Sequence, residues 1–398
     1  MQLVVADAFP ELFLADFHDM GLEVDYRPDV KAEELGLALA KANIVVVRSK
    51  KVSRAAIEGA SRLELILRAG AGVDTIDVAA ASERGIYVAN CPGKNSVAVA
   101  ELAMGLMLSV DRRIPDGTRD LAAGKWNKKE YSKAAGLKGR TLGIAGFGAI
   151  GKEVARRALG FEMNVLAWSL GLTEDEARRE GASVVSSLWE LAERSDVVSV
   201  HMPQTSETKG MFGDAFFARM KAGATFINTS RGSLHDTAAL LRAMKERGIK
   251  AALDVFENEP AGGTADFDHE LCKVPGFVGT HHIGASTEQA QHAIAAEAVR
   301  ICRTFVTTGH VPHVVNIERT SPAKVQLIVR HLDKVGVLAS VLGVIKQYGL
   351  NVEEMSNTIF AGAKAAVATI RLGGDAPTEL LTAILGLEEV LDASVKHL

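Results

Sequence analysis

The chain has 398 residues, of which 47% are hydrophobic and 24% charged, and its 45 Lys+Arg against 49 Asp+Glu leave a formal net charge of −4. This balance is typical of a globular protein with two or three domains and excludes a largely disordered chain. No long basic run occurs, so the sequence argues against nucleic acid or a membrane surface as partner and favours a small-molecule ligand.

The three cysteines, Cys91, Cys272 and Cys302, are widely spaced and form no metal-type pair, which predicts reduced thiols in the cytoplasm and no metal site. The N-terminal run "MQLVVADAFP" lacks a basic region and a cleavage motif, so it predicts a first strand rather than a signal peptide. The most apolar stretch, residues 96–110, contains Glu101 and is too short to span a bilayer.

The first 98 residues alternate short β-branched runs with helical stretches. Strand-like runs at 3–7, 43–49, 63–70 and 85–92 predict a parallel α/β sheet. The next stretch, residues 95–113, is apolar all round and predicts a buried helix with Ser96 as its N-cap. We expect this helix to mark the junction with a second domain.

The alternation restarts after this helix, and strand-like runs at 141–146, 164–168, 196–202, 224–229 and 251–256 predict a second parallel α/β domain. A long helix is expected over residues 287–309, followed by a linker at 310–322 that contains two prolines. The remaining residues read strand, helix, strand, strand, helix, strand. This order predicts a third, small ferredoxin-like domain.

A glycine motif marks the start of the second domain. In "TLGIAGFGAIGKEVARRA", Gly146, Gly148 and Gly151 follow a strand and open a helix with G-x-G-x-x-G spacing. The first glycine permits the tight turn, the second lets the backbone approach a pyrophosphate, and the third allows close helix–strand packing. An ordinary strand-to-helix turn is the alternative, but the context favours a Rossmann dinucleotide site.

The strand after this helix departs from the usual pattern for NAD. The position expected to hold an acid for the adenosine ribose is Ser169, 23 residues after Gly146. An acid there would repel the extra phosphate of NADP, whereas serine adds no charge. Arg178 and Arg179 lie farther along the chain, so the sequence alone leaves the choice between NAD and NADP open.

Three predicted strands of the second domain end in chemically useful side chains. Arg231 follows "ATFINT", Glu259 follows "AALDVF", and His281 and His282 follow "GFVGT". Ligands of a doubly wound sheet lie beyond the carboxyl ends of its strands. An arginine that grips a carboxylate, a histidine that takes a hydroxyl proton and a glutamate that fixes its tautomer suit hydride transfer from a 2-hydroxy acid. Surface salt bridges are the alternative for each residue taken alone.

Several motifs together resemble the D-isomer-specific 2-hydroxyacid dehydrogenases: "RAGAGVDTIDVAA", "NSVAVAELAMGLML", "GRTLGIAGFGAIG", "NTSRGSLHDTAALLRAM", "AALDVFENEP" and "HIGAST". The resemblance implies a flavodoxin-like substrate-binding domain (1–98 and 287–317), a Rossmann domain (99–286) and a C-terminal ACT domain (323–398). It places the catalytic trio on Arg231, Glu259 and His282, and leaves His281 where the family usually has proline.

The resemblance also implies a set of ligand contacts. Cofactor contacts are expected, besides the glycine loop, at Ala71, Ala149, Ile150, Ser169, Met202, Pro203, Thr208, Thr229, Arg231, His282 and Gly284, and from Asp254 to the nicotinamide amide. Substrate contacts are expected at Gly70, Ala71, Asn95, Arg231 and His282.

Phosphate recognition is expected from basic residues of the first domain. Arg48, Lys50 and Lys51 end one predicted strand and Arg68 ends another, so several cations could converge on the substrate. The alternative is that they are solvated strand-end residues, and for Lys50 and Lys51 the sequence favours neither interpretation.

The leading hypothesis is NAD-dependent oxidation of 3-phosphoglycerate to 3-phosphohydroxypyruvate, the entry to serine synthesis, by a cytoplasmic homodimer or homotetramer. One alternative is another D-2-hydroxyacid dehydrogenase or 2-oxoacid reductase, with NADP as a further cofactor option. A second alternative is a nucleotide-sensing binding protein, because some relatives of this fold act as transcriptional corepressors.

The ACT resemblance implies an amino-acid effector, L-serine, bound at an interface between two such domains by His331, Asp333 and Asn351. Asp333 stands where the family pattern commonly has asparagine, and therefore adds a negative charge. Gly336 lies in the adjacent loop, whose amides could receive a carboxylate. The alternative is that these residues only cap turns in a dimerising module.

Overall fold

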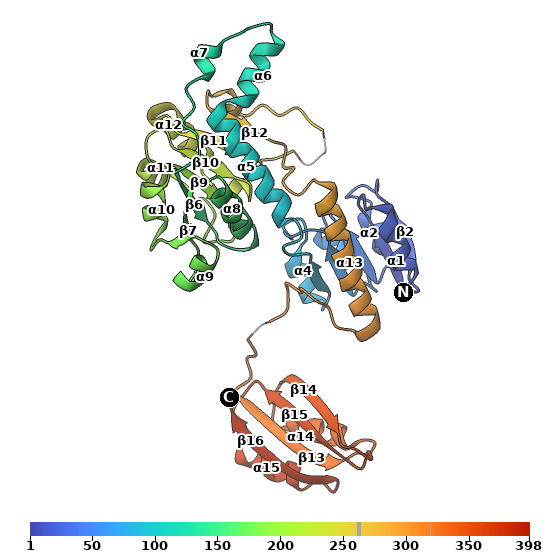
Figure 1. Cartoon of the computed structure of the whole chain (residues 1–398). Helices are drawn as coiled ribbons and strands as arrows, with labels where there is room; N and C mark the ends of the chain where they lie inside the picture. Colours follow the sequence, from blue (N-terminus) through green and yellow to red (C-terminus); the bar gives the residue numbers. More distant parts are fainter. Residues whose placement is uncertain (261–263, 319) are drawn as a thin grey trace. The chain divides into compact units, whose positions relative to one another are not determined.

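The computed structural model describes residues 1–260, 264–318 and 320–398. By their internal contacts these residues form two compact units, Met1–Asn316 and Ile317–Leu398 (Figure 1). The first unit contains two parallel sheets, and the second unit contains a single antiparallel sheet. The chain is therefore an α/β protein built on parallel sheets, as the alternation of strands and helices predicts.

The N-terminal sheet has five parallel strands in the order β2-β1-β3-β4-β5, the doubly wound order of flavodoxin. Its strands are β1 Gln2–Val5, β2 Glu23–Tyr26, β3 Ile44–Val47, β4 Leu65–Arg68 and β5 Tyr87–Asn90. Helices α1 Leu14–His18 and α13 Glu288–Thr308 cover one face, and α2 Leu35–Leu39, α3 Arg54–Glu58 and α4 Val78–Glu83 cover the other. Strand β2 was not predicted.

The second sheet has seven parallel strands in the order β12-β11-β10-β9-β6-β7-β8. Its strands are β6 Thr141–Ala145, β7 Asn164–Trp168, β8 Ser183–Val184, β9 Val197–Val200, β10 Thr225–Asn228, β11 Lys250–Leu253 and β12 Phe277–Gly279. Numbered from β6, six of them follow the Rossmann order 3-2-1-4-5-6, and β12 extends that edge. The order reverses between β6 and β9, the point at which such sheets bind ligands.

Both faces of this sheet are covered by helices. Helices α5 Ser96–Arg112, α8 Ala149–Gly160 and α9 Glu174–Arg179 contribute to the core on one face. Helices α10 Leu188–Arg194, α11 Asp214–Arg219 and α12 Thr237–Arg247 contribute to the core on the other, around Phe212, Phe216, Phe217 and Phe226. Because helices bury both faces, strands β9 and β10 are buried throughout.

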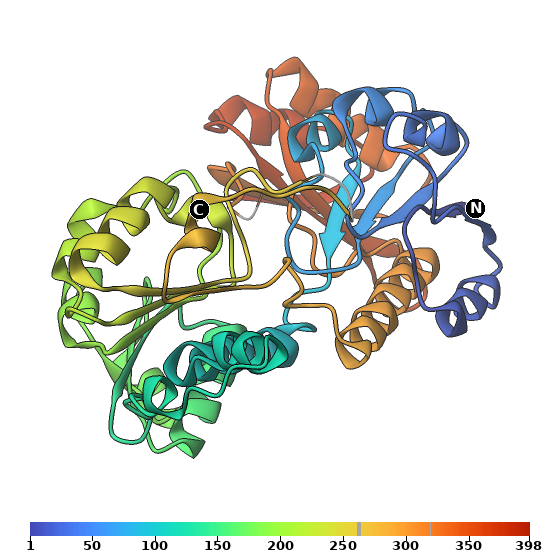
Figure 2. The ribbon, with the colours of Figure 1, turned by 90° about the horizontal axis from the view of Figure 1, so that it is seen from above.

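Two long helices connect the two sheets. Helix α5 leaves the end of β5 and packs on the seven-stranded sheet and α8, and α13 returns to pack on the five-stranded sheet (Figure 1, Figure 2). The N-cap of α5 is Asn95, not the predicted Ser96, which is already the first helical residue. Asn95 makes no side-chain cap bond, so a side-chain capping signal could not have located this helix start.

The predicted linker at 310–322 belongs in part to the first unit. Val314 forms a bridge with Ala89, and the Asn316 side chain accepts a hydrogen bond from Val88 N and donates one to Ile86 O. Strand β5 is an edge strand, and this segment covers its unpaired backbone groups. Residue 319 of the linker lies outside the described residues.

Helices α6 Ile114–Ala122 and α7 Lys128–Tyr131 extend from the end of α5 (Figure 1) and were not predicted. They contain no buried residue, because the apolar residues of α6, Ile114 and Leu121, lie on an exposed face and do not pack on a core. Arg113, with φ 53°, makes the turn between α5 and α6. Leu121 and Trp126 are left exposed on this hairpin.

The second unit runs β13 Val325–Leu332, α14 Val337–Gln347, β14 Val352–Ile359, β15 Ala365–Leu372, α15 Thr378–Leu385 and β16 Val390–His397. Its sheet is antiparallel with the order β14-β15-β13-β16, and this connectivity is that of a ferredoxin-like fold. No helix among the described residues of the whole chain is long and apolar enough to cross a bilayer.

Candidate active site

The glycine loop after β6 has the close contacts that the motif predicts. Gly146 has φ 95°, and a Cβ there would overlap the carbonyl of His201. A Cβ on Gly151 would overlap the carbonyl of Gly146, whereas one on Gly148 would meet no atom within 4 Å. The chain thus packs tightly on two sides of the loop and leaves space at Gly148, at the N-terminus of α8, where a pyrophosphate would bind.

The other predicted cofactor residues of this domain lie on the loops that follow β7, β9 and β10. Ser169 comes directly after β7, next to Trp168, whose carbonyl accepts a hydrogen bond from Gly146 N (2.8 Å). Met202 is buried after β9, and Thr208 donates to the Pro203 carbonyl (2.8 Å), which folds residues 203–208 into a turn. Thr229 is buried at the end of β10. Ala149 and Ile150 begin α8.

The two arginines on the helix after β7 differ in their contacts. Arg178, on α9, donates to Asp175 at 3.2 Å and lies 3.8 Å from Glu174. Arg179 is exposed, and none of the ion pairs recorded among the described residues involves it. These arginines and Ser169 therefore do not by themselves discriminate between NAD and NADP.

His282 and Glu259 form a hydrogen-bonded pair. The His282 Nδ1 to Glu259 Oε2 distance is 2.6 Å, and Phe256 N donates to the other carboxylate oxygen at 2.8 Å. The hydrogen bond to Glu259 raises the pKa of His282, while burial acts the other way. Burial pushes the pKa of Glu259 up, but the hydrogen bonds from His282 and Phe256 lower it overall. With Nδ1 bound to the carboxylate, Nε2 is left to exchange a proton with a substrate.

The backbone at His282 is in the left-handed region, with φ 54°, which is uncommon for a residue other than glycine. Asp254 holds this loop: its carboxylate accepts hydrogen bonds from Thr280 Oγ1 (2.6 Å), Ile283 N (2.8 Å) and Gly284 N (2.8 Å). The Asp254 carbonyl also accepts from His282 N. Sequence reasoning gave Asp254 only a cofactor role and missed its part in shaping the histidine loop.

His281 differs from its neighbour in every contact. It is exposed, and none of the hydrogen bonds recorded for residues 1–260, 264–318 and 320–398 involves its side chain. The structure therefore separates the two adjacent histidines: His282 has the carboxylate partner, and His281 has solvent.

Arg231 follows β10 and reaches the loop after β4. Its Nε and Nη2 lie 2.9 and 2.8 Å from Asp74 Oδ2, and its Nη1 donates to the Ser230 carbonyl at 2.7 Å. The Arg231 carbonyl accepts from the Asn228 side chain (2.9 Å), which also contacts His235 Nδ1 (3.1 Å). Asp74 was missed by sequence reasoning, although it stands within "RAGAGVD", one of the runs that identified the resemblance.

Arg68 of the five-stranded sheet lies close enough to Arg231 and to Arg48 for both charges to act on it. Burial, followed by the charges of Arg231 and Arg48, lowers the pKa of Arg68 to about 10, and Asp74 acts in the opposite direction. Arg68 Nε is buried without a hydrogen-bond partner among the described residues. A Cβ on Gly70 would overlap the Arg68 guanidinium, so glycine is needed there. Clustered guanidinium groups of this kind suit a ligand with several negative charges.

The remaining predicted substrate residues have mixed placements. The Ala71 carbonyl accepts from Asn90 Nδ2 at 2.6 Å, which fixes the loop after β4, and Asn90 was not predicted. Asn95, at the start of α5, has a buried Oδ1 without a partner among the described residues, as expected for a ligand-facing amide. Lys50 donates to the Pro28 carbonyl at 2.9 Å, and Lys51 is exposed, which agrees with the structural alternative for both.

The three predicted effector residues are not brought together within one chain. His331 is buried near the end of β13 and contacts Asn357, whereas Asn351 precedes β14 and donates to Glu353. On β15, Leu372 pairs with Val325 of β13 on one side and with Val352 of β14 on the other. Asn351 therefore lies level with the start of β13, whereas His331 lies near its end, roughly 20 Å away along the strand. Asp333 follows β13 and is partly exposed.

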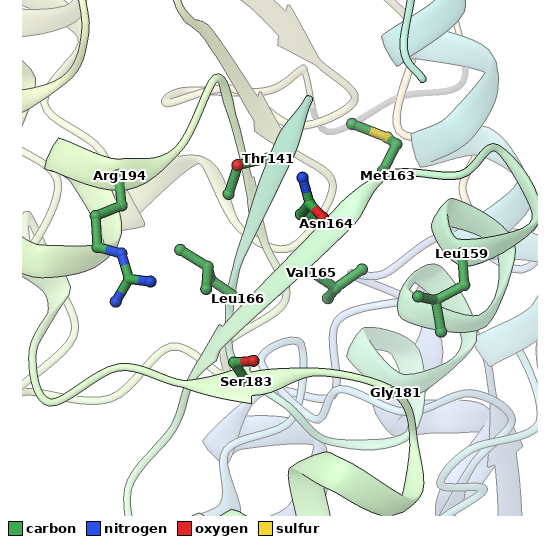
Figure 3. Close-up of a pocket in the computed structure, with 9 residues that line it drawn as sticks. All are labelled: Thr141, Leu159, Met163, Asn164, Val165, Leu166, Gly181, Ser183 and Arg194. Carbon is green, nitrogen blue, oxygen red and sulfur yellow. The ribbon is translucent and has the colours of Figure 1, made fainter. Parts of the chain in front are cut away.

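Two cavities lie away from these residues. One of about 410 Å³ is lined by Thr141, Asn164, Leu166, Ser183 and Arg194, and Figure 3 shows it beside β7 and β8. Another of about 370 Å³ lies against α6 and α7. Thr141 and Asn164 begin β6 and β7, so the first cavity is at the strand ends opposite to the glycine loop. Neither cavity is lined by a predicted site residue.

Comparison with known proteins gives consistent matches. Residues 104–284 match the family model described as D-isomer specific 2-hydroxyacid dehydrogenase, NAD binding domain. The chain is 36% identical over 374 residues to a D-3-phosphoglycerate dehydrogenase of Methanocaldococcus jannaschii, covering 94% of this chain and 67% of that one. It is 37% identical to a glyoxylate reductase of Thermococcus litoralis, covering 74% of this chain and 90% of that one.

Among solved structures, the chain resembles NAD⁺-bound 3-phosphoglycerate dehydrogenase of Entamoeba histolytica with a TM-score of 0.67 and 30% identity. The match covers 80% of this chain and 99% of that one. The chain spans about two thirds of the length of the Methanocaldococcus protein, so the latter has sequence for which this chain has no counterpart.

Proposed function

The chain belongs to the D-isomer-specific 2-hydroxyacid dehydrogenase family, with an NAD-binding domain, and within that family we propose that it oxidises 3-phosphoglycerate to 3-phosphohydroxypyruvate with NAD. The observation that supports this substrate is Arg68, whose buried Nε has no partner among the described residues and on which the charges of Arg231 and Arg48 both act. A 2-hydroxy acid with a phosphate brings a carboxylate and a phosphate dianion to these arginines, whereas glyoxylate or lactate brings one carboxylate.

The catalytic roles follow from the contacts of three residues. Arg231 binds the substrate carboxylate and orients the hydroxyl carbon. His282 Nε2 accepts the hydroxyl proton, and Glu259 holds Nδ1–H and stabilises the imidazolium that forms. A bound NAD would supply the hydride acceptor at the same carbon, where the alcohol would become a ketone.

The NAD fit rests on residues of this chain. The open space at Gly148, the N-terminus of α8, the turn at Pro203–Thr208 and the buried Thr229 would hold the dinucleotide. Asp254 would contact the nicotinamide amide through the one lone pair, on Oδ2, that its three recorded donors leave free. Ala71, Ser169 and Gly284 are proposed as further contacts.

Steady-state kinetics tests the proposal. 3-Phosphoglycerate, glycerate, lactate, glyoxylate and hydroxypyruvate, each with both nicotinamide cofactors, form the panel. We expect the highest kcat/KM for 3-phosphoglycerate with NAD in the oxidative direction and for its 2-oxo product in reduction. Glyoxylate or hydroxypyruvate as the best substrate would instead identify a reductase, a function supported by the similarity to the Thermococcus enzyme. No turnover of any substrate would favour a nucleotide-sensing role.

We infer further that the second unit is an ACT domain that binds an amino acid such as L-serine between two copies of the chain. The ferredoxin-like connectivity supports the domain assignment, and the separation of His331 from Asn351 within one chain is compatible with a site completed by a second copy. Binding heat and inhibition by millimolar L-serine on the full chain, both lost in a chain ending before Thr320, would support it. Without either effect the unit is structural only.

A homodimer or homotetramer in the cytoplasm is part of this proposal. The exposed apolar side chains of the α6–α7 hairpin, Ile114, Leu121 and Trp126, support self-association. Light scattering coupled to gel filtration measures the oligomeric state, and a monomer at micromolar concentration would contradict it.

A further inference from the structure

Arg231 is the residue through which the two sheets of the first unit meet at the proposed substrate site. It stands after β10 of the seven-stranded sheet, and its partner Asp74 stands in the loop after β4 of the five-stranded sheet, 157 residues away in sequence. One oxygen, Asp74 Oδ2, accepts a hydrogen bond from Nε (2.9 Å) and forms an ion pair with Nη2 (2.8 Å) of the guanidinium. A planar group held to one carboxylate oxygen through two of its nitrogens has its direction constrained.

The donors of Arg231 can be counted. A guanidinium has five N–H groups; Asp74 accepts a hydrogen bond from the one on Nε and only pairs by charge with Nη2, and the Ser230 carbonyl accepts one from Nη1. At least one N–H on each terminal nitrogen is then left for a substrate. We propose that Asp74 is a positioning residue, which holds Arg231 so that these two terminal N–H groups face the carboxylate of the 2-hydroxy acid.

The loop that contains Asp74 is shaped around this contact. A Cβ on Gly72 would overlap Arg231 Nη2 and would come within 2.8 Å of Asp74 Oδ2. Any residue other than glycine at position 72 would therefore displace the guanidinium or its partner. Gly72 and Asp74 together therefore fix the position of the Arg231 guanidinium.

Asp74 also offsets part of the positive charge at the site. The charges of Arg231 and Arg48 act on Arg68, and the Asp74 carboxylate acts on it in the opposite direction, so removing Asp74 would leave this cationic group with less negative charge beside it. Arg231 is 31% exposed and Asp74 49%, so the pair adds little to stability. Its effect is on the direction of the guanidinium rather than on the free energy of unfolding.

This inference rests on the proposed function, because it takes Arg231 as the group that binds the substrate carboxylate. Asp74 could instead act as a competitor that occupies Arg231 until substrate displaces it. The two roles predict opposite changes: loss of a positioning residue weakens carboxylate binding, and loss of a competitor strengthens it.

The test compares Asp74→Ala and Asp74→Asn with Asp77→Asn as the matched control. Asp77 lies in the same loop and loses the same charge, but its side chain caps α4 through Ala80 N, a role that asparagine also fills. Calorimetry measures the dissociation constant of oxamate, an unreactive carboxylate analogue, in the presence of NADH. Kinetics measures KM and kcat for 3-phosphohydroxypyruvate.

Asp74→Ala is expected to raise the oxamate dissociation constant and KM about tenfold, with a smaller effect on kcat, because the arginine is no longer held in the productive direction. Asp74→Asn should have an intermediate effect, since its amide oxygen still accepts one N–H. Asp77→Asn should match the wild type. In an Arg231→Lys background, Asp74→Ala should change either constant less than about twofold, because the partner is gone.

Several results would overturn the inference: oxamate binding that is unchanged or tighter in Asp74→Ala, no oxamate binding by the wild type, or an equal loss from Asp74→Ala with and without Arg231. Thermal melts of each variant separate these results from unfolding. A wild-type chain that binds oxamate through Arg231 but reduces no 2-oxo acid would refute the proposed function and leave the Asp74 inference intact.

Discussion

The two parallel sheets of the first unit present different kinds of site residue. At the seven-stranded sheet, His282, Glu259 and Asp254 have their hydrogen bonds supplied by neighbours in the same domain. At the five-stranded sheet, Arg68 is partly buried with an unpartnered Nε, and Asn95 has an unpartnered Oδ1. The first set is preorganised without a ligand, and the second is incomplete without one. Under the proposed function, the acid/base pair and the carboxylate-binding Arg231 belong to the seven-stranded sheet, and the cations proposed to bind phosphate belong to the five-stranded sheet.

The largest expected effect is the loss of turnover when the proposed acid/base group is removed. His282→Ala should lower kcat by roughly 10²–10⁴-fold, because no other side chain is held by Glu259 to exchange the hydroxyl proton. His281→Ala is the control, and should stay near the wild type because its side chain is exposed. Steady-state kinetics on matched preparations decides it. Equal losses from the two variants would contradict the assignment.

Removing a cation of the five-stranded sheet should instead change binding. Arg68→Ala and Arg48→Ala are expected to raise KM for the phosphorylated substrate roughly 10–100-fold, since a charged hydrogen bond to phosphate contributes about 1.5–3 kcal/mol. The effect on kcat should be smaller. Lys51→Ala, which removes an exposed cation of the same domain, serves as control. An unchanged KM in both arginine variants would end the phosphate hypothesis.

Glu259→Gln keeps the shape of the side chain at position 259 and removes its negative charge. Glu259 raises the pKa of His282, so the variant should lower it. Reduction of the 2-oxo acid needs protonated His282, so the alkaline limb of its pH–rate profile should move to lower pH. Oxidation needs neutral His282, and its acid limb should move the same way. A pH–rate profile identical to the wild type would show that the carboxylate does not act through this histidine.

The buried histidines of the seven-stranded domain predict a loss of stability in acid. Burial lowers the pKa of His201 to about 3 and, as the largest cause, that of His235 to about 4. The unfolded chain takes up these protons below about pH 6.5 and the folded chain does not, so the free energy of unfolding falls as pH drops from 6.5 toward 4. The slope is roughly 1.4 kcal/mol per pH unit for each histidine.

Urea denaturation at pH 7.0 and 5.0 measures this slope. His235→Val should reduce it, and His281→Ala, which changes an exposed histidine, should leave it unchanged. If His235→Val and the wild type lose the same free energy between the two pH values, His235 is not a source of the acid sensitivity.

The smallest expected effect concerns cofactor choice. Ser169→Asp should raise the ratio of kcat/KM for NAD over NADP, because a carboxylate near the ribose repels the extra phosphate. The change is expected to be about tenfold. A wild-type chain already exclusive for NAD would show that selectivity depends on other groups.

Much of the fold and site followed from sequence pattern, and the misses have physical causes. The buried strands were predicted because burial on both faces requires apolar runs. Strand β2, Glu23–Tyr26, was missed because it is an edge strand with charged residues, and α6 was missed because it buries none of its residues. The sequence of 310–316 predicts a linker, because this segment pairs with β5 through backbone groups and the side chain of one asparagine, which leave no apolar pattern.

The sequence by itself determined the dinucleotide loop, the alternation of most strands and helices, and the arginine, glutamate and histidine that follow three strands. Each of these depends on local spacing: a turn that needs glycine, or a side chain that directly follows a strand. Only the tertiary structure decided which of two adjacent histidines meets Glu259, that Asp254 holds their loop, and that Asp74 reaches Arg231 across 157 residues. These contacts depend on strand order and loop direction, because residues far apart in the chain meet only where parallel sheets bring their carboxyl ends together.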